Sequence, residues 1–187
     1  MLKTNFDPFP ELETKRLVLR RMTSSDAHDL FLLRSNKAVM EYQDRPIASS
    51  REEMSDRIAN LDAEIYEGKS IEWAVSTYDN TRLIGTIGIW KIIKKHHRGE
   101  VGFMLIPDYY NKGLMTEALA AVIDYGFNDM CLHSLEGQVT PENIASIKVL
   151  ERNGFVREAY YKENYLFEGD FIDTAVYSLL KSKRKYE

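Results

Sequence analysis

The stretch from Val101 to Leu119 contains the residues whose types and spacing most clearly support chemistry. An apolar run is broken at Pro107-Asp108, and a helix with apolar residues at helical spacing begins near Gly113. The start of a helix offers unpaired backbone N–H groups and the positive end of the helix dipole, which together bind phosphates. Gly113 allows a ligand to approach the backbone closely, and Lys112 adds a positive charge. The pattern therefore predicts an anion-binding turn.

The same residues also fit an ordinary strand, turn and helix, because a single glycine is a weak motif. A resemblance favours the functional interpretation. Residues 110–115 resemble the acyl-CoA-binding signature of the GNAT superfamily of N-acyltransferases, Gln/Arg-x-x-Gly-x-Gly/Ala. Tyr110 stands where the signature has Gln or Arg, and Met115 stands where it has Gly or Ala. The continuation from Met115 to Leu119 is similar to the branch that includes the ribosomal-protein N-acetyltransferases.

Two further segments resemble the same branch. Residues 14–20 are similar to its first strand, and residues 141–155 are similar to its fourth helix and the turn that follows. The three segments occur in the family's order and span most of the chain. The resemblance implies an enzyme that transfers an acetyl group from acetyl-CoA to a primary amine, above all to the N-terminal α-amino group of a protein.

The resemblance also implies which residues hold acetyl-CoA, the co-substrate of a reaction that needs no metal. In the superfamily, backbone groups of the strand before the turn hold the thioester oxygen, and the pantetheine arm runs along that strand like an added strand. The residues implied in binding are Phe103, Leu105, Asn111, Lys112, Gly113, Leu114, Met115, Thr116 and Asn143.

N-acetylation requires a group that accepts the amine proton, and Glu100 is the first candidate. Many relatives have a glutamate at this place, where it acts through water. A free α-amino group titrates near pH ~8, so a mild base is sufficient. Glu163 is the second candidate, in a register that also fits Asn164. A glutamate at a strand end equally fits a solvated surface residue.

The leaving thiolate must be protonated, and the resemblance gives this role to Ser146. Many superfamily members have a tyrosine seven residues after the position of Asn143, but here that position is Leu150, which donates no proton. Ser146 lies one helical turn after Asn143, on the same face, and the ribosomal branch has a serine there. The alternative is that Asn143 is an ordinary N-cap and Ser146 a surface serine.

These candidates need strands and helices to position them. Alternation and turn signals predict strands at residues 16–21, 71–78, 83–90, 98–106, 135–140, 155–167 and 171–180. Helices are expected after Thr23 and Ser49, from Gly113 to about Asn128, and over residues 143–152. The order β-αα-βββ-α-β-α-ββ predicts an α/β fold: a mixed, mostly antiparallel sheet of about seven strands flanked by about four helices, which matches the GNAT fold.

Composition and length limit the remaining possibilities. The chain has 187 residues, of which 44% are hydrophobic and 29% charged, so we expect one domain over residues 9–181 and a basic tail at 182–187. One cysteine excludes an internal disulfide and a cysteine-built metal site. The net charge of −4 argues against a nucleic-acid partner. The sequence shows neither a membrane span nor a secretory leader, so we expect a cytoplasmic monomer or homodimer.

The identity of the acceptor stays open at this point. In the GNAT fold residues 36–68 would shape the acceptor pocket, and they contain no motif that identifies a substrate. One alternative is therefore an acetyltransferase for a small molecule such as an amino acid, polyamine or aminoglycoside. Another is a catalytically silent acyl-CoA-binding module, because Leu150 replaces the tyrosine.

Overall fold

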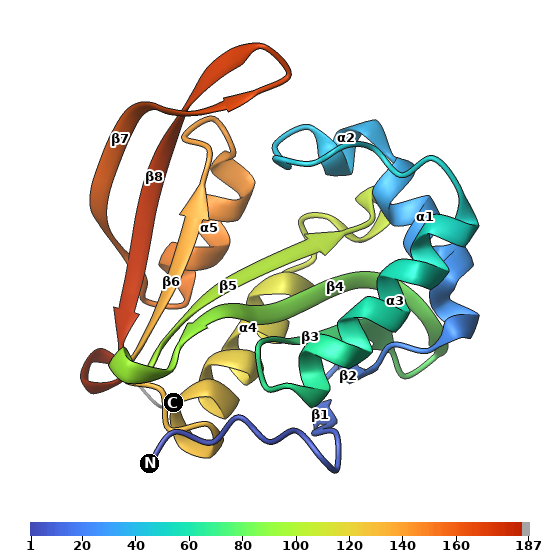
Figure 1. The fold of residues 1–187 in the computed structure, drawn as a ribbon, viewed down its shortest axis with the longest axis horizontal. Helices are drawn as coiled ribbons and strands as arrows, with labels where there is room; N and C mark the ends of the chain where they lie inside the picture. The colour runs from blue at the N-terminus through green and yellow to red at the C-terminus, as the bar shows by residue number, and fades with distance from the viewer. Residues whose placement is uncertain (185–187) are drawn as a thin grey trace.

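The computed structural model describes residues 1–184, which form one eight-stranded sheet with helices on both faces (Figure 1). The strand order is β1-β2-β3-β4-β5-β6-β8-β7. The strands are β1 (Leu12–Glu13), β2 (Leu17–Arg21), β3 (Ile71–Thr77), β4 (Asn80–Ile93), β5 (Arg98–Leu105), β6 (Ser134–Val139), β7 (Val156–Phe167) and β8 (Asp170–Leu180). The α-helices are α1 (Ala27–Ser35), α2 (Lys37–Met40), α3 (Arg51–Tyr66), α4 (Leu114–Asp124) and α5 (Ile144–Arg152).

The two faces of the sheet are covered by different helices. Helices α1 and α3 lie on one face, and α4 lies on the other, where α5 packs beside it (Figure 1). Helix α3 presents a buried stripe at helical spacing, formed by Met54, Ile58, Leu61 and Ile65. Six of the seven residues of β3 are buried, as expected for a strand covered on both sides. The core therefore continues through the sheet.

The predicted fold is confirmed, with two additions and one shift. Strand β1 has only two residues, too few to show an alternation, and it pairs with β2. Helix α2 is a single turn that begins after Asn36, whose side chain accepts a hydrogen bond from the Ala38 amide. Helix α4 ends at Asp124, and a π-helical segment follows over Tyr125–Asp129. None of these features leaves a periodic signal in the sequence.

The expected basic tail is partly docked on the domain. Lys181–Lys183 form a 3-10 turn, and the Arg184 Nε lies 3.0 Å from an oxygen of Asp124. Residues 185–187 of that tail lie outside the described part of the chain. Within residues 1–184, no helix combines the length and the apolar character that crossing a membrane requires.

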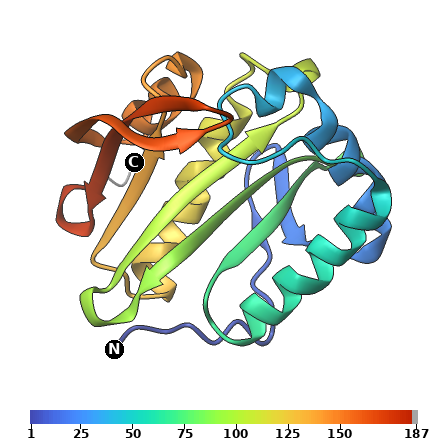
Figure 2. The ribbon, with the colours of Figure 1, turned by 45° about the horizontal axis from the view of Figure 1, so that its top comes forward.

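The seam between β5 and β6 is the one parallel pairing in the described sheet, and it is short. It contains three residue pairs, Arg98 with Ser134, Gly99 with Leu135 and Glu100 with Glu136. Beyond Glu100 the two strands diverge (Figure 1). The β7–β8 hairpin arches over this side of the sheet towards the loop of residues 41–50 (Figure 2). The divergence leaves one edge of β5 open.

Candidate active site

The divergence of β5 and β6 opens a cavity of about 480 Å³. Its floor is the face of the sheet on which Glu72, Thr86 and Trp90 lie. The first turn of α5, the loop after α2 and the middle of β7 form its rim. Residues that the sequence separates widely line this one space: Tyr42, Arg45, Arg57, Glu100, Phe103, Gln138, Asn143, Ser146, Asn164 and Thr174.

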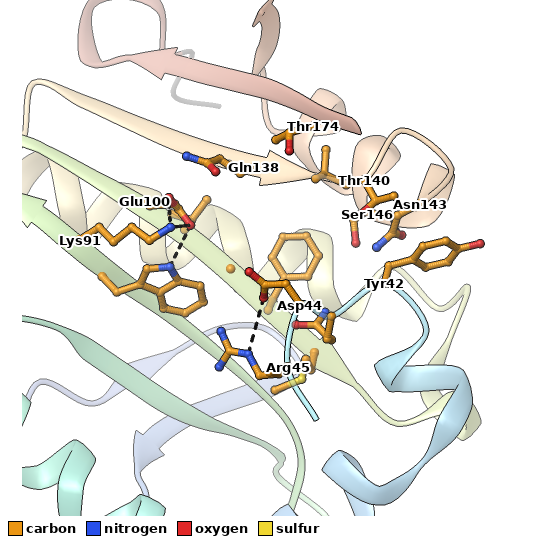
Figure 3. Close-up of a pocket in the computed structure, with 18 of the residues that line it drawn as sticks. Tyr42, Asp44, Arg45, Lys91, Glu100, Gln138, Thr140, Asn143, Ser146 and Thr174 are labelled. Carbon is orange, nitrogen blue, oxygen red and sulfur yellow. Dashed lines mark hydrogen bonds and ion pairs between the residues drawn. The ribbon is translucent and has the colours of Figure 1, made fainter. Parts of the chain in front are cut away.

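Glu100 lies in this cavity and is held from two sides (Figure 3). The Trp90 indole N–H donates to Glu100 Oε1 at 3.0 Å, and Lys91 Nζ lies 3.0 Å from Oε2. The Glu100 side chain is only 12% exposed. Gly102 makes this arrangement possible, because a Cβ there would lie 2.2 Å from the Trp90 ring. The carboxylate is therefore fixed in position, with its charge balanced by a lysine.

Asn143 and Ser146 lie at the opposite rim, on the first turn of α5 (Figure 3). Asn143 Oδ1 accepts a hydrogen bond from the Ser146 amide at 3.1 Å, so Asn143 is the N-cap of the helix. Both residues line the cavity. Leu150 is buried one turn further on, where it packs against Gly137 of β6. The position at which many relatives have a tyrosine therefore holds a packing residue in this chain.

The open edge of β5 presents backbone groups to the gap. The Ile106 amide donates to the Ile84 carbonyl at 2.9 Å, on the β4 side. Backbone groups alternate in direction along a strand, so Gly102 and Met104 also face β4. The N–H and C=O groups of Phe103 and Leu105 consequently face the gap, beyond the last pair with β6. An extended ligand can pair with such an edge as a strand would.

The predicted anion-binding turn follows β5 and leads into α4. Gly113 is the N-cap of α4 with φ 73°, and no side chain caps this helix. Since an L side chain rarely adopts that φ, the turn favours glycine. The side chains of Leu114 and Met115 are buried, so these two residues could contact a ligand only through their backbone amides. The turn therefore leaves the first backbone amides of α4 without a side-chain acceptor.

Arg16 and Thr14, ahead of β2, hold this turn in place. Arg16 Nη1 donates to the Lys112 carbonyl at 2.9 Å, and its Nε lies 2.7 Å from Glu117 on the first turn of α4. The Thr14 hydroxyl donates to Glu117 as well, at 2.6 Å. Burial alone would raise the pKa of Glu117, but these hydrogen bonds outweigh it and lower the pKa. The Glu117 carboxylate is thereby paired with Arg16 and Thr14.

Glu163, the second predicted base, does not line the cavity, whereas Asn164 does. The cause is an irregularity in β7 that is fixed by Asp173 of β8. Asp173 accepts a hydrogen bond from the Glu163 amide at 2.7 Å and one from the Tyr160 hydroxyl at 2.5 Å. Glu163 itself has a positive φ of 47° and an exposed side chain.

The structure thus brings Glu100, Phe103, Asn143 and Ser146 to one cavity, with Leu105 and residues 111–116 at the far end of β5. Charged residues that the sequence did not single out lie beside them. Arg57 of α3 forms an ion pair of 2.7 Å with Glu72 of β3, and both line the cavity. The sequence feature that could have identified Glu72 as a site residue is its position, because it is the one charged residue of β3. No three potential metal-ligating side chains are grouped in residues 1–184.

Comparisons with known proteins agree with this geometry. Residues 16–156 match the family model of the acetyltransferase (GNAT) domain. The uncharacterized N-acetyltransferase YoaA of Bacillus subtilis is 34% identical over 175 residues, which are 94% of this chain and 99% of that protein. The ribosomal-protein-S5-alanine acetyltransferase of Vibrio fischeri has a similar structure, with a TM-score of 0.82, 26% identity, and 95% and 100% coverage. The spermidine N-acetyltransferase of Vibrio cholerae, solved with CoA and spermine, shares the fold, with a TM-score of 0.80, 24% identity, and 91% and 98% coverage.

Proposed function

The chain belongs to the GNAT acetyltransferases, and from that premise we propose that it transfers the acetyl group of acetyl-CoA to the N-terminal α-amino group of a protein. We assign this activity to residues 9–181. The observation that carries the proposal is the open edge of β5, which runs from the uncapped start of α4 into the cavity that contains Glu100 and Ser146.

Each part of this path fits one part of acetyl-CoA. The α4 N-terminus, with the Leu114–Thr116 amides and Lys112, suits the pyrophosphate. The edge of β5 at Phe103 and Leu105 suits the pantetheine arm, because its amide groups pair with unpaired strand backbone. When bound, acetyl-CoA supplies an acetyl group activated as a thioester, and a backbone N–H of β5 holds the thioester oxygen.

The remaining chemistry falls to side chains of the two rims. The amine attacks the thioester carbon, an amide C–N bond forms and the C–S bond breaks. The amine proton passes to Glu100 through water, and the departing thiolate takes a proton from the Ser146 hydroxyl, which recovers it from solvent. Glu100 is suited to this role because Trp90 and Lys91 keep its carboxylate in one place.

The charges in the cavity favour a protein N-terminus over a polyamine. A polyamine carries several positive charges and requires carboxylates that lack other partners. Four carboxylates line the cavity. Glu72 is paired with Arg57, Glu100 with Lys91 and, more loosely, Asp44 with Arg45, while Glu64 accepts a hydrogen bond from the Ser70 hydroxyl. A protein N-terminus brings one amine, and its backbone offers hydrogen-bonding groups to a polar cavity.

The test is an acetyl-CoA consumption screen with short peptides that have free N-termini, spermidine and an amino sugar as acceptors. We expect thiol release and N-terminal acetylation with peptides. Turnover confined to spermidine or the amino sugar would overturn the protein acceptor. Binding of acetyl-CoA without turnover on any amine would favour a silent binding module.

A further inference from the structure

Two arginines line the acceptor side of the cavity, and a third, buried arginine lies near them without lining it. Arg45, in the loop after α2, and Arg57 of α3 line the cavity, and Figure 3 shows Arg45 reaching into it beside Asp44. Arg34 of α1 lies close to both arginines and is itself only 7% exposed. Its burial, and then the positive charges of Arg45 and Arg57, lower the pKa of Arg34. Like charges are thus gathered in one place.

Arg34 has a buried nitrogen without a partner. Its Nε is fully buried and makes no hydrogen bond, and its side chain forms no ion pair within the described residues. Arg20, by contrast, donates to both oxygens of the buried Asp26 at 2.8 and 2.7 Å. A buried N–H group that makes no hydrogen bond is costly, because burial removes its hydration and no acceptor replaces the water. Buried polar atoms without a hydrogen bond are rare in folded proteins, so the presence of this one needs a physical explanation.

The nearby carboxylates do not meet the need of three guanidinium groups. Glu72 is buried and is in contact with Arg57. Asp44 is exposed and lies 3.8 Å from Arg45, a loose pair. Glu53 accepts hydrogen bonds from the amide and the hydroxyl of Ser49, at 2.8 and 2.9 Å, and acts on Arg34 only at a distance.

We propose that Arg45 and Arg57, with Arg34 buried behind them, form a binding site for a carboxylate carried by the acceptor. The inference rests on the proposed acetylation of an amine and narrows it to amines that bear an acidic group. A carboxylate accepts paired hydrogen bonds from a guanidinium, which is why arginine suits this task. The carboxylate comes either from an acidic side chain near a protein N-terminus or from the α-carboxylate of a free amino acid.

Matched acceptors test the proposal. The kcat/KM is measured for a peptide that begins Ala-Asp and for its Ala-Asn counterpart, and for alanine against alaninamide. We expect the acidic member of one pair to be preferred by about ten- to a hundredfold, the size of a hydrogen-bonded charge contact.

Variants of the arginines then test whether these residues cause the preference for acidic acceptors. Arg45→Gln is expected to lose the preference by reducing kcat/KM for the acidic acceptor alone, and Arg45→Lys to keep part of it, since lysine lacks the planar fork. Arg51→Gln is the matched control, because Arg51 is exposed at the start of α3 and does not line the cavity. Arg34→Met removes the buried charge behind the two lining arginines. It should reduce the preference while leaving the melting temperature unchanged or higher, which separates an electrostatic role in binding from a structural one.

The outcomes distinguish this inference from the proposed function. A preference for Ala-Asp peptides supports both. A preference for alanine over alaninamide, without peptide acetylation, supports the arginine site and overturns the protein acceptor. Equal kcat/KM for Ala-Asp and Ala-Asn peptides, unchanged in Arg45→Gln, overturns the arginine site and leaves the protein acceptor intact. Acetylation of spermidine alone overturns both.

Discussion

The β5 wall and the α5 wall of the cavity present their polar groups in different ways. Strand β5 offers backbone groups at Phe103 and Leu105, and it is paired with β4 along its other edge. Helix α5 offers side chains from its first turn, at Asn143 and Ser146. Backbone groups survive most substitutions, whereas side-chain groups do not. The comparison teaches that the β5 wall is sensitive to conformation and the α5 wall to residue identity.

The largest effect is expected on the α5 wall. Ser146→Ala should lower kcat by roughly ten- to a thousandfold with little change in the KM for acetyl-CoA, because in the proposed mechanism its hydroxyl protonates the departing thiolate. Steady-state kinetics with acetyl-CoA as the varied substrate measures both constants. An unchanged kcat would mean that water or another side chain protonates the thiolate, and would remove the main chemical role of this wall.

Glu100 is an exception on the β5 wall, since in the proposed mechanism it is the side chain through which this wall takes part in the chemistry. Glu100→Gln should lower kcat/KM for the amine by about ten- to a hundredfold below pH ~8. The loss should shrink at higher pH, because the free amine then loses its proton unaided.

Glu163→Gln is the control for this experiment, since Glu163 is exposed and outside the cavity. A pH–rate profile of both variants on one amine gives the answer. The reverse result, with the pH-dependent loss in Glu163→Gln, would place the base on β7. Equal losses at every pH in both variants would mean that the carboxylates only attract the cationic substrate.

On the β5 wall, acetyl-CoA binding should depend most on the backbone conformation of the turn at Gly113, after the end of β5. Gly113→Val should weaken acetyl-CoA binding by about tenfold, because a β-branched residue does not tolerate φ near 73° and the turn must re-aim its amides. Phe103→Leu changes a side chain but leaves the backbone edge of β5 intact. The Kd of this variant for acetyl-CoA should therefore stay near that of the parent protein. Calorimetric titration of both folded variants is the measurement. Equal affinities would remove the anion site from this turn.

The smallest effect is expected for Asn143 on the α5 wall, where substitutions can separate its role as the N-cap of α5 from a direct contact with CoA. Asn143→Ala should lower the free energy of unfolding by about 1 kcal/mol, because the Ser146 amide loses its acceptor. Asn143→Asp keeps the acceptor and should retain that stability. Denaturant unfolding and acetyl-CoA affinity are measured for both variants. A fall in affinity that is shared by both would show that the amide group also contacts CoA.

The fold was predictable because its signals are local. Alternation, capping residues and turn glycines each act within a few positions, and the strands and helices follow from them. The partners inside the cavity depend on packing and register. Arg57 meets Glu72 only because α3 packs on the face of β3 that carries Glu72.

The position of Glu163 shows the same limit. Between the pairs Tyr161–Thr174 and Tyr165–Ile172, β7 advances four residues while β8 advances two. This irregularity exchanges which of Glu163 and Asn164 faces the cavity. The two extra residues of β7 interrupt the regular alternation of side chains, so sequence alone did not decide between the two.

The open edge of β5 should also be visible in the rates at which its amides exchange hydrogen with solvent. Gly102 and Met104 are bonded to β4, whereas Phe103 and Leu105 face the gap. Amide exchange should therefore alternate along β5, slow at Gly102 and Met104 and fast at Phe103 and Leu105. Acetyl-CoA bound along that edge would slow exchange at the fast amides and leave exchange at the slow amides unchanged. The alternation of exchange rates should therefore disappear when the substrate binds.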